Sequence, residues 1–306
     1  QVNYDNGLYL NSLKFIYDSE VAAQALTTWQ STIGNDIVKK PWLVVNANDP
    51  AGREIIVTDS RNNLILLTGG GNIRWSLPLP GPVLGQIHQV DYYRNGKLQY
   101  LFNTKDRIYL IDRNGKNVDG FPVALKSPAT NGINVFDYDN NRNYRYAVAG
   151  EDRKIYMYDQ KGKTVSGWDF GRTGDLVTTP VQHFRISGKD YIVFKDAKQV
   201  YILDRRGDTR IAADFSINYS ANPLILNMHG TPKIVTTDNT GSVHYIYFDG
   251  KHEVKKTSRF SKDHFFVLDD LDGNKIPDFI FTDKNEITVF DANGKKLFSK
   301  KTGKAI

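Results

Sequence analysis

The sequence predicts an all-β fold, a β-propeller of six four-stranded blades, and leaves a partial seventh blade at the N-terminus as an alternative. One observation is a segment that recurs six times, a β-branched or aromatic strand followed by a tight turn that contains Gly. Its copies begin 44, 47, 45, 43 and 44 residues apart, at Leu64, Ile108, Ile155, Val200, Val243 and Ile287. A strand-built repeat of about 40–50 residues is typical of propeller blades. The other observation is composition, because the 306 residues include 17 Tyr and 16 Phe, which favour strands.

Four strands can be assigned within one repeat, residues 133–173. Ile133–Phe136 is the expected first strand, and the polar residues after it form a hairpin loop. Tyr144–Val148 alternates as a second strand, Ile155–Tyr158 is the third, and Val165–Phe170 gives a looser fourth. Four antiparallel strands joined by short loops make one sheet, and radial stacking of such sheets covers both of their faces.

The same assignment places the six blades at regular positions along the chain. Their expected ranges are 41–81, 86–126, 132–173, 179–220, 222–262 and 264–304. Residues 36–306 are therefore expected to form the propeller domain. Length alone suggests about two domains, but one closed array of this kind uses nearly the whole chain.

The first 35 residues do not follow the period and are expected to form accessory strands and a short helix. Thr28–Ile33 resembles Arg74–Leu79, a fourth strand that leads into the first strand of a blade. Leu8–Tyr17 is a further strand-like run, and Ser19–Leu26 is a short helical pattern. This segment either adds strands outside the last blade or forms a partial seventh blade. We favour six full blades plus an accessory segment.

Charge and composition narrow the range of functions. The net charge is +6, Cys is absent, and no apolar run is long enough to span a membrane. The absence of Cys excludes disulfides and thiol chemistry without selecting a compartment. Because the chain begins with Gln1 and not with Met, we expect either a processed exported protein or an excerpt of a longer one.

The sharpest local motif is the segment 270–278, in which oxygen-bearing side chains recur at every second position. The candidate metal ligands are four side chains and one backbone carbonyl, those of Asp270, Asp272, Asn274, Asp278 and, through its carbonyl, Ile276. Calcium takes six to eight oxygen ligands, and this spacing wraps them around one point. One structural Ca²⁺ ion is therefore a candidate ligand, and otherwise no cofactor is expected.

The alternative interpretation of this motif is a polar hairpin loop whose Asp side chains bond their own backbone. The loop Asp137–Asn143 supports the alternative, because it keeps the early oxygens but is followed by Arg145. We expect that arginine to pair with Asp137 and Asp139 in place of a cation.

Basic residues group in the expected fourth strands of the last two blades. They are Lys255, Lys256, Arg259, Lys262, Lys295, Lys296, Lys300, Lys301 and Lys304. Because fourth strands form the outer edge of a propeller, these residues are expected to make one basic wall. The wall either contacts an anionic surface or an acidic partner, or protects exposed strand edges from pairing with another chain. Nucleic acid is not expected, since no recognised motif accompanies the charge.

Other recurring residues are explained by the fold. One Asp follows the second strand of each repeat, at Asp59, Asp106, Asp152, Asp196, Asp238 and Asp283, and Asp is a favoured turn residue. The six His residues show no metal-ligand spacing, and no G-x-S-x-G segment is present. No catalytic residue is assigned. Enzymatic activity is left open, with a non-enzymatic role favoured.

The repeated unit I/V-Y-x-Y/L/F-D-x-x-G-K, with Gly71-Asn-Ile-Arg-Trp75 in the first blade, resembles quinoprotein-like and WD40-like propeller repeats. The segment 270–278 resembles the calcium loop of FG-GAP blades, D-x-D-x-D/N-x-x-x-D. It departs from that loop at Lys275, where Gly is usual. This resemblance implies the fold, and it implies no activity.

A second resemblance concerns the start of the propeller. It is similar to the C-terminal region of an uncharacterised exported family from Bacteroidota, in the combination Trp29, Pro41, Val57-Thr-Asp59, Leu64 and Trp75. The resemblance implies a location in the cell envelope, periplasmic or associated with the outer membrane.

We therefore expect a non-enzymatic binding or scaffolding propeller of the cell envelope that mediates protein–protein interaction. The expected partner is an envelope protein, with an anionic surface or a glycan as further possibilities. The alternative function is a glycan-binding or glycan-cleaving propeller. A site of that kind needs aromatic side chains and two carboxylates that converge at one end of the channel.

Overall fold

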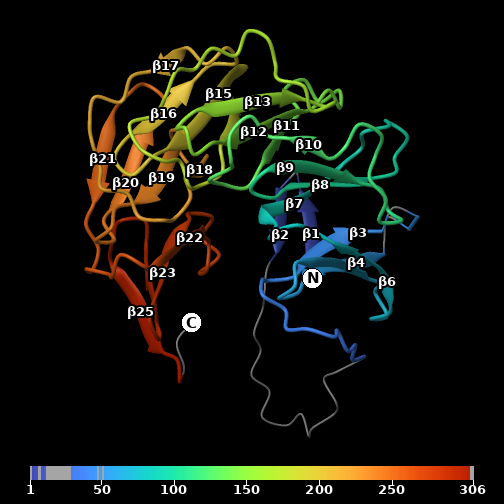
Figure 1. The fold of residues 1–306 in the computed structure, drawn as a ribbon. Helices are drawn as coiled ribbons and strands as arrows, with labels where there is room; N and C mark the ends of the chain where they lie inside the picture. The colour runs from blue at the N-terminus through green and yellow to red at the C-terminus, as the bar shows by residue number, and fades with distance from the viewer. Residues whose placement is uncertain (1, 6–7, 12–28, 47, 50–51, 304–306) are drawn as a thin grey trace, which may run out of the picture.

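The computed structural model describes residues 2–5, 8–11, 29–46, 48–49 and 52–303. Its elements are β-strands, which confirms the all-β prediction (Figure 1). Leu8–Asn11 is a strand as expected, whereas the rest of the run to Tyr17 and the helix expected at 19–26 lie outside the described residues. The described part of the chain contains no helix long and apolar enough to cross a bilayer.

Six antiparallel sheets follow one another, each made of consecutive strands. The first blade contains β3 (Trp42–Val45), β4 (Arg53–Thr58), β5 (Asn63–Leu67) and β6 (Ile73–Pro78). The second contains β7 (Leu84–Val90), β8 (Gln99–Asn103), β9 (Arg107–Ile111) and β10 (Val123–Ala124). The third contains β11 (Asn134–Phe136), β12 (Arg145–Ala149) and β13 (Ile155–Asp159).

The later blades repeat the same order of strands. The fourth contains β14 (Gln182–Ile186), β15 (Lys189–Lys195), β16 (Val200–Leu203) and β17 (Thr209–Ile211). The fifth contains β18 (Ile225–Asn227), β19 (Lys233–Thr237), β20 (Val243–Tyr247) and β21 (His252–Lys255). The sixth contains β22 (Phe265–Asp269), β23 (Asp278–Asp283), β24 (Glu286–Phe290) and β25 (Lys296–Lys301). The first and second strands, β1 (Val2–Asp5) and β2 (Leu8–Asn11), form a separate two-stranded sheet.

The third blade lacks the fourth strand expected at Val165–Phe170. Its chain meets β13 through a bridge between Tyr158 and Thr164 and a hydrogen bond from the Val165 N–H to the Met157 carbonyl at 2.8 Å, and it forms no fourth strand there. Gly167 then takes a left-handed φ of 86°, which turns the chain away from the sheet. The aromatic residues after it pack between blades instead of continuing the strand.

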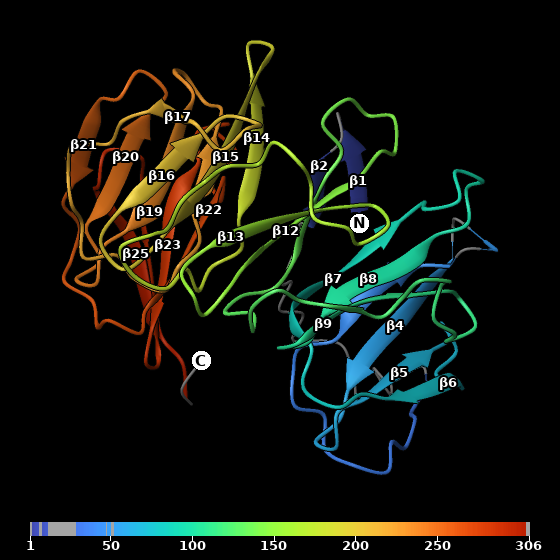
Figure 2. The ribbon, with the colours of Figure 1, turned by 45° about the horizontal axis from the view of Figure 1, so that its top comes forward.

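The blades stand side by side in an arc (Figures 1 and 2), and apolar layers between successive blades form the core. In the layer between the first two blades, Ile56 and Leu66 pack with Tyr100 and Phe102, and all four are fully buried. Four more layers join the second blade to the third and so on to the sixth. Among the described residues, no such layer joins the sixth blade to the first. In Figure 1 the first and last blades lie at the two ends of the arc.

A second contact between neighbouring blades lies at the outer end of each sheet. Trp75, in β6, lies against Gly115 in the turn between the last two strands of the second blade, and its Nε1 donates to the Arg113 carbonyl at 2.9 Å. A Cβ on Gly115 would meet the Trp75 ring at 2.9 Å. Val123 lies against Gly162 and Phe170 against Gly207 in the same way. The outer end of one blade is therefore held on a glycine turn of the next.

The recurring Asp residues shape turns, as the sequence indicates. Asp112 and Asp159 each accept the N–H groups two and four residues further on, closing the turn between the third and fourth strands. In the loops between second and third strands, Asp59 accepts the N–H groups of Arg61 and Asn63 in the same manner. These carboxylates therefore stabilise their own turns through hydrogen bonds from backbone N–H groups.

We expect Gly115→Ala to destabilise the protein more than Gly120→Ala. Both glycines have a left-handed φ, 80° and 83°, so each Ala costs about 1–2 kcal/mol. A Cβ at Gly120 has no atom within 4 Å, whereas one at Gly115 strikes Trp75 and adds about 1–3 kcal/mol of overpacking. Urea unfolding of the two variants measures the difference, and equal losses of stability would show that the Trp75 contact is not tight.

Candidate functional site

The basic residues singled out in the sequence lie at the outer ends of the fifth and sixth blades. Lys255 ends β21, and Lys256, Arg259 and Lys262 lie in the connection from β21 to β22. Lys295 lies in the turn before β25. β25 itself carries the others, Lys296, Lys300 and Lys301. Lys304 lies outside the described residues.

The two basic segments meet where the fifth blade touches the turn before β25. The Lys256 carbonyl lies 3.3 Å from the place that a Cβ on Gly294 would take, so Lys256 and Lys295 belong to one surface. We call the eight residues Lys255, Lys256, Arg259, Lys262, Lys295, Lys296, Lys300 and Lys301 the basic surface. Within the described residues its one ion pair joins Lys255 and Glu253, at 3.8 Å. The charge of this surface is therefore largely uncompensated.

β25 is the outermost strand of the last blade, and each of its six residues is exposed. Its free edge offers unpaired backbone groups to another chain. Lysine on such an edge hinders pairing with a second strand, because burying its charge is costly. The same charges attract an acidic partner, so edge protection and partner binding use the same residues here.

The acidic motif forms the loop between β22 and β23. The carboxylates of Asp270, Asp272 and Asp278 offer oxygens that lie within 4.8 Å of one another. Asp278 is buried and accepts the Leu271 N–H at 3.0 Å. Burial, followed by repulsion from Asp272 and Asp270, raises the pKa of the Asp278 carboxyl. A cation placed among the three oxygens would relieve this repulsion.

The other two expected ligands take part in the backbone of the loop. The Asn274 side-chain oxygen accepts the Ile276 N–H at 2.7 Å, and its Nδ2 donates to Asp272 at 2.8 Å. Ile276 is partly exposed beside a cavity between the fifth and sixth blades. The structure thus brings the three carboxylates together and leaves Asn274 bonded within the turn.

Hydrogen bonds to one Asp set the shape of this loop. Asp270 accepts the N–H groups of Asn274 and Lys275, and Lys275 has a left-handed φ of 68°. The second and third blades repeat this arrangement. In the second blade Asp91 accepts hydrogen bonds from the N–H groups of Asn95 and Gly96. In the third blade Asp137 accepts from Asn141 and Arg142, and Arg142 also has a left-handed φ, 62°. The turn geometry is therefore shared. Among the described residues, the sixth blade is the one that brings three carboxylates together at such a turn.

The expectation that Arg145 pairs with Asp137 and Asp139 is wrong. Arg145 donates instead to the Asn143 side chain and to the Tyr144 carbonyl. Asp139 is paired with Arg205 of the next blade at 2.9 Å. The partner comes from the neighbouring sheet, which sequence spacing within one loop does not reveal.

Arg205 belongs to a charged cluster between the third and fourth blades that the sequence did not indicate. Its Nε donates to Asp190 at 2.7 Å, and the other oxygen of Asp190 lies 2.8 Å from His183 Nε2. Its guanidinium also lies over the Tyr138 ring, 4.4 Å from the ring centre. These contacts join segments that are far apart in the sequence, and they hold two blades together.

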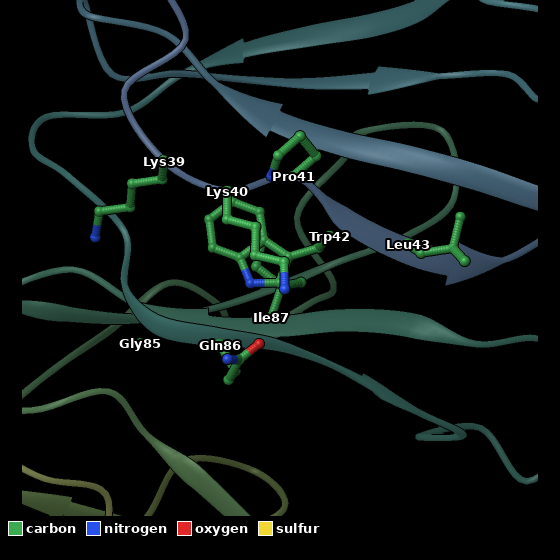
Figure 3. Close-up of a pocket in the computed structure, with 8 residues that line it drawn as sticks. All are labelled: Lys39, Lys40, Pro41, Trp42, Leu43, Gly85, Gln86 and Ile87. Carbon is green, nitrogen blue, oxygen red and sulfur yellow. The ribbon is translucent and has the colours of Figure 1, made fainter. Parts of the chain in front are cut away.

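A cavity of about 550 Å³ lies at the inner strands of the first two blades (Figure 3). Its lining includes Lys39, Lys40, Trp42, Gln86 and Ile87, and it contains no carboxylate. A cavity that cleaves a glycoside needs two carboxylates. This cavity therefore does not supply the site that the glycan-cleaving alternative requires.

Comparison with known proteins identifies the fold. No protein-family model matches the chain, and no curated protein matches it. Two crystal structures of BBS1N in complex with ARL6DN, soaked with lead and with mercury, match with TM-scores of 0.58 and 0.60. Both are 12% identical and cover 89% of this chain and 83% of theirs. The crystal structure of BamB from Moraxella catarrhalis matches with a TM-score of 0.51 at 15% identity, over 86% of this chain and 74% of that one. The chain therefore has a β-propeller fold.

We expect Asp278→Asn to raise the thermal stability at pH 7 in the presence of a chelator. The raised pKa means that the folded state favours the protonated carboxyl, so its stabilising contribution is present at low pH and is lost as the pH rises through that pKa. Asn keeps an acceptor for the Leu271 N–H and removes the repelling charge. Calorimetry should show a melting temperature a few degrees higher, with the gain shrinking in acid. The control is Asp214→Asn, which changes an exposed carboxyl outside this loop. A lower melting temperature for Asp278→Asn would contradict this account.

Proposed function

We propose that this propeller is a non-enzymatic protein-binding module and that its basic surface receives an acidic partner. The observation that carries the proposal is the concentration of largely unpaired cations on the outer ends of the fifth and sixth blades. Opposite charge steers association and suppresses wrong partners. Edge protection alone would explain the lysines of β25, but not Lys256, Arg259 and Lys262, which lie outside the strands.

The proposed location is the cell envelope. This part of the proposal is supported by the resemblance of the first blade to an exported family, which the sequence supplies through Trp29, Pro41 and Trp75. The propellers that are similar in fold include one solved in complex with a protein, ARL6DN. That neighbour supports a binding role in kind, without identifying a partner for this chain.

We expect the double variant Lys256→Ala/Lys296→Ala to lose its partner at physiological salt. The purified protein would be immobilised and exposed to solubilised envelope proteins, with retained proteins identified after washing at increasing salt. Retention should weaken with ionic strength, because screening weakens contacts between exposed charges. The matched control is Lys116→Ala/Lys163→Ala, which removes two exposed lysines from the corresponding turns of the second and third blades.

Two results would contradict the proposal. One is equal retention of the same proteins by both double variants, which would show that the basic surface is not the binding face. The other is binding to vesicles of phosphatidylglycerol, lost in Lys256→Ala/Lys296→Ala, with no protein retained. That second result would assign the surface to an anionic membrane.

We propose in addition that Asp270, Asp272 and Asp278 hold one structural Ca²⁺ ion. The support is the approach of three carboxylates within 4.8 Å and the raised pKa of Asp278, both of which a divalent cation would stabilise. The ion would hold the loop between β22 and β23 and so stiffen the sixth blade. The alternative is a loop shaped by its own hydrogen bonds, as at Asp91 and Asp137.

Calcium should raise the melting temperature of the wild-type protein, and chelator should reverse the rise. Calorimetric titration with CaCl₂ should give one site, and Asp272→Asn should abolish both effects because it removes one charged ligand. The matched control is Asp139→Asn, in the corresponding loop of the third blade, which should leave the response to calcium unchanged. A melting temperature that ignores both calcium and chelator would refute the site.

A further inference from the structure

The outward face of the sixth blade is an apolar sheet surface that no other blade covers within the part of the chain that the structure describes. Register places Val267, Ile280, Val289 and Phe298 opposite one another in a row across all four strands. Val267 and Phe298, at the ends of this row, are 53% and 48% exposed, and Phe265 in the next row is 65% exposed. The opposite face, with Phe266 and Phe281, is buried against the fifth blade.

The outward face of the first blade carries a matching row. Leu43, Ile55, Leu67 and Ile73 lie opposite one another across β3, β4, β5 and β6. Leu43 and Ile73, at its ends, are 64% and 49% exposed. Inside the propeller, rows of this kind are covered by the next blade, as where Ile56 and Leu66 meet Tyr100. Among the described residues, these two faces therefore lack a neighbouring blade, and they lie at the two ends of the arc (Figure 1). Their exposure is at the ends of the rows, since Leu67 and Val289 in the middle are buried.

Residues 29–33 already lie where a blade preceding the first would end. Trp29 packs on Gly71, and a Cβ on that glycine would lie 2.3 Å from the Trp29 ring. This is the contact that Trp75 makes with Gly115 one blade later. Ile33 then packs on Val57 and Ile65, in the middle of the open face of the first blade. The chain thus enters the propeller from the outer end of a seventh blade position between the sixth blade and the first.

We propose that the β1–β2 hairpin of this chain occupies the seventh blade position, with the open faces of the sixth and first blades on its two sides. The hairpin forms a two-stranded sheet of its own and pairs with no strand of the described blades. An isolated two-stranded hairpin is at best marginally stable in water, and the flanking apolar rows offer it cover. The 17 residues between Asn11 and Trp29 reach up to about 55 Å, enough to cross the position.

The occupant is assigned to the same chain because this hairpin is the next described element on the N-terminal side of Trp29. Its connection to the position is therefore intramolecular, which favours it over a second molecule at ordinary protein concentrations. The proposed seventh position concerns the faces of the sheets. Lys300 of the basic surface shares the row of Phe265 on this face, whereas Lys296 lies opposite Phe290 on the other face. Lys256→Ala/Lys296→Ala leaves Lys300 in place, so either proposal can fail without the other.

Cysteine cross-linking tests the proposal directly, because the chain contains no Cys and each bond is therefore assignable. The test variant carries Leu10→Cys with Val267→Cys, and the matched control carries Leu10→Cys with Val254→Cys. Val254 is 45% exposed on β21, away from the open face, and Val267 is 53% exposed on β22. Under mild oxidation we expect an intramolecular disulfide in the test variant and little in the control, read by peptide mass and by migration without reductant.

A second measurement keeps the proposal falsifiable if the disulfide geometry is poor. The single variants Val267→Cys and Val254→Cys would be labelled with a maleimide in the full chain and after removal of residues 1–11. Loss of the hairpin should speed labelling at 267 several-fold and leave labelling at 254 unchanged. Circular dichroism confirms that each variant retains its strand content.

Three outcomes would overturn the proposal. The first is equal cross-linking of Leu10→Cys to both positions. The second is a labelling rate at 267 that does not respond to removal of the hairpin. The third is a disulfide between two molecules that disappears on dilution, which would assign the seventh position to a second copy of the chain.

Discussion

The packing of one blade face on the next is the contact on which the rest of this structure depends. Each sheet is apolar on both faces, and a sheet of this kind is stable only when neighbours cover it. Burying one Val, Leu, Ile or Phe side chain contributes about 1.5–3 kcal/mol relative to leaving it exposed. The rows across β22–β25 and β3–β6 are the places where this contact is missing, since Val267 and Leu43 remain more than half exposed. A propeller that closes on itself removes such faces.

The outer ends of the blades are held by a different contact. Trp75 on Gly115 and Phe170 on Gly207 place a ring against a left-handed turn, so that no side chain larger than hydrogen fits there. This contact holds the outer ends of neighbouring blades together at the rim of the propeller. It also makes Trp29 on Gly71 informative, because the same contact marks the end of a blade that precedes the first.

Charge gathers where the sheets end and not where they pack. The basic surface lies on the rim of the last two blades, and the acidic loop of the sixth blade lies at a strand connection. Between the third and fourth blades the charged groups are paired, as Arg205 is with Asp190 and Asp139. The proposed binding surface and the proposed calcium loop thus differ from the repeat at positions outside the packed faces of the blades. The packing of the blades does not restrict the residues at these positions.

The sequence by itself determined the repeating blades, their order and most of their strands, because a period of about 44 residues with alternating strands has few structural solutions. It left six or seven blades open. It also determined the turn role of Asp112 and Asp159, since that role needs only neighbours within the turn. It failed at Val165–Phe170, where Gly167 redirects the chain and tertiary packing of the aromatic residues replaces a strand. Only the tertiary structure decided that Asp139 meets Arg205, that three of the five candidate ligands converge, and that two apolar faces lack a neighbour. Each of these depends on contacts between segments many residues apart. A local sequence pattern does not indicate which distant side chain lies beside a given residue in the folded protein.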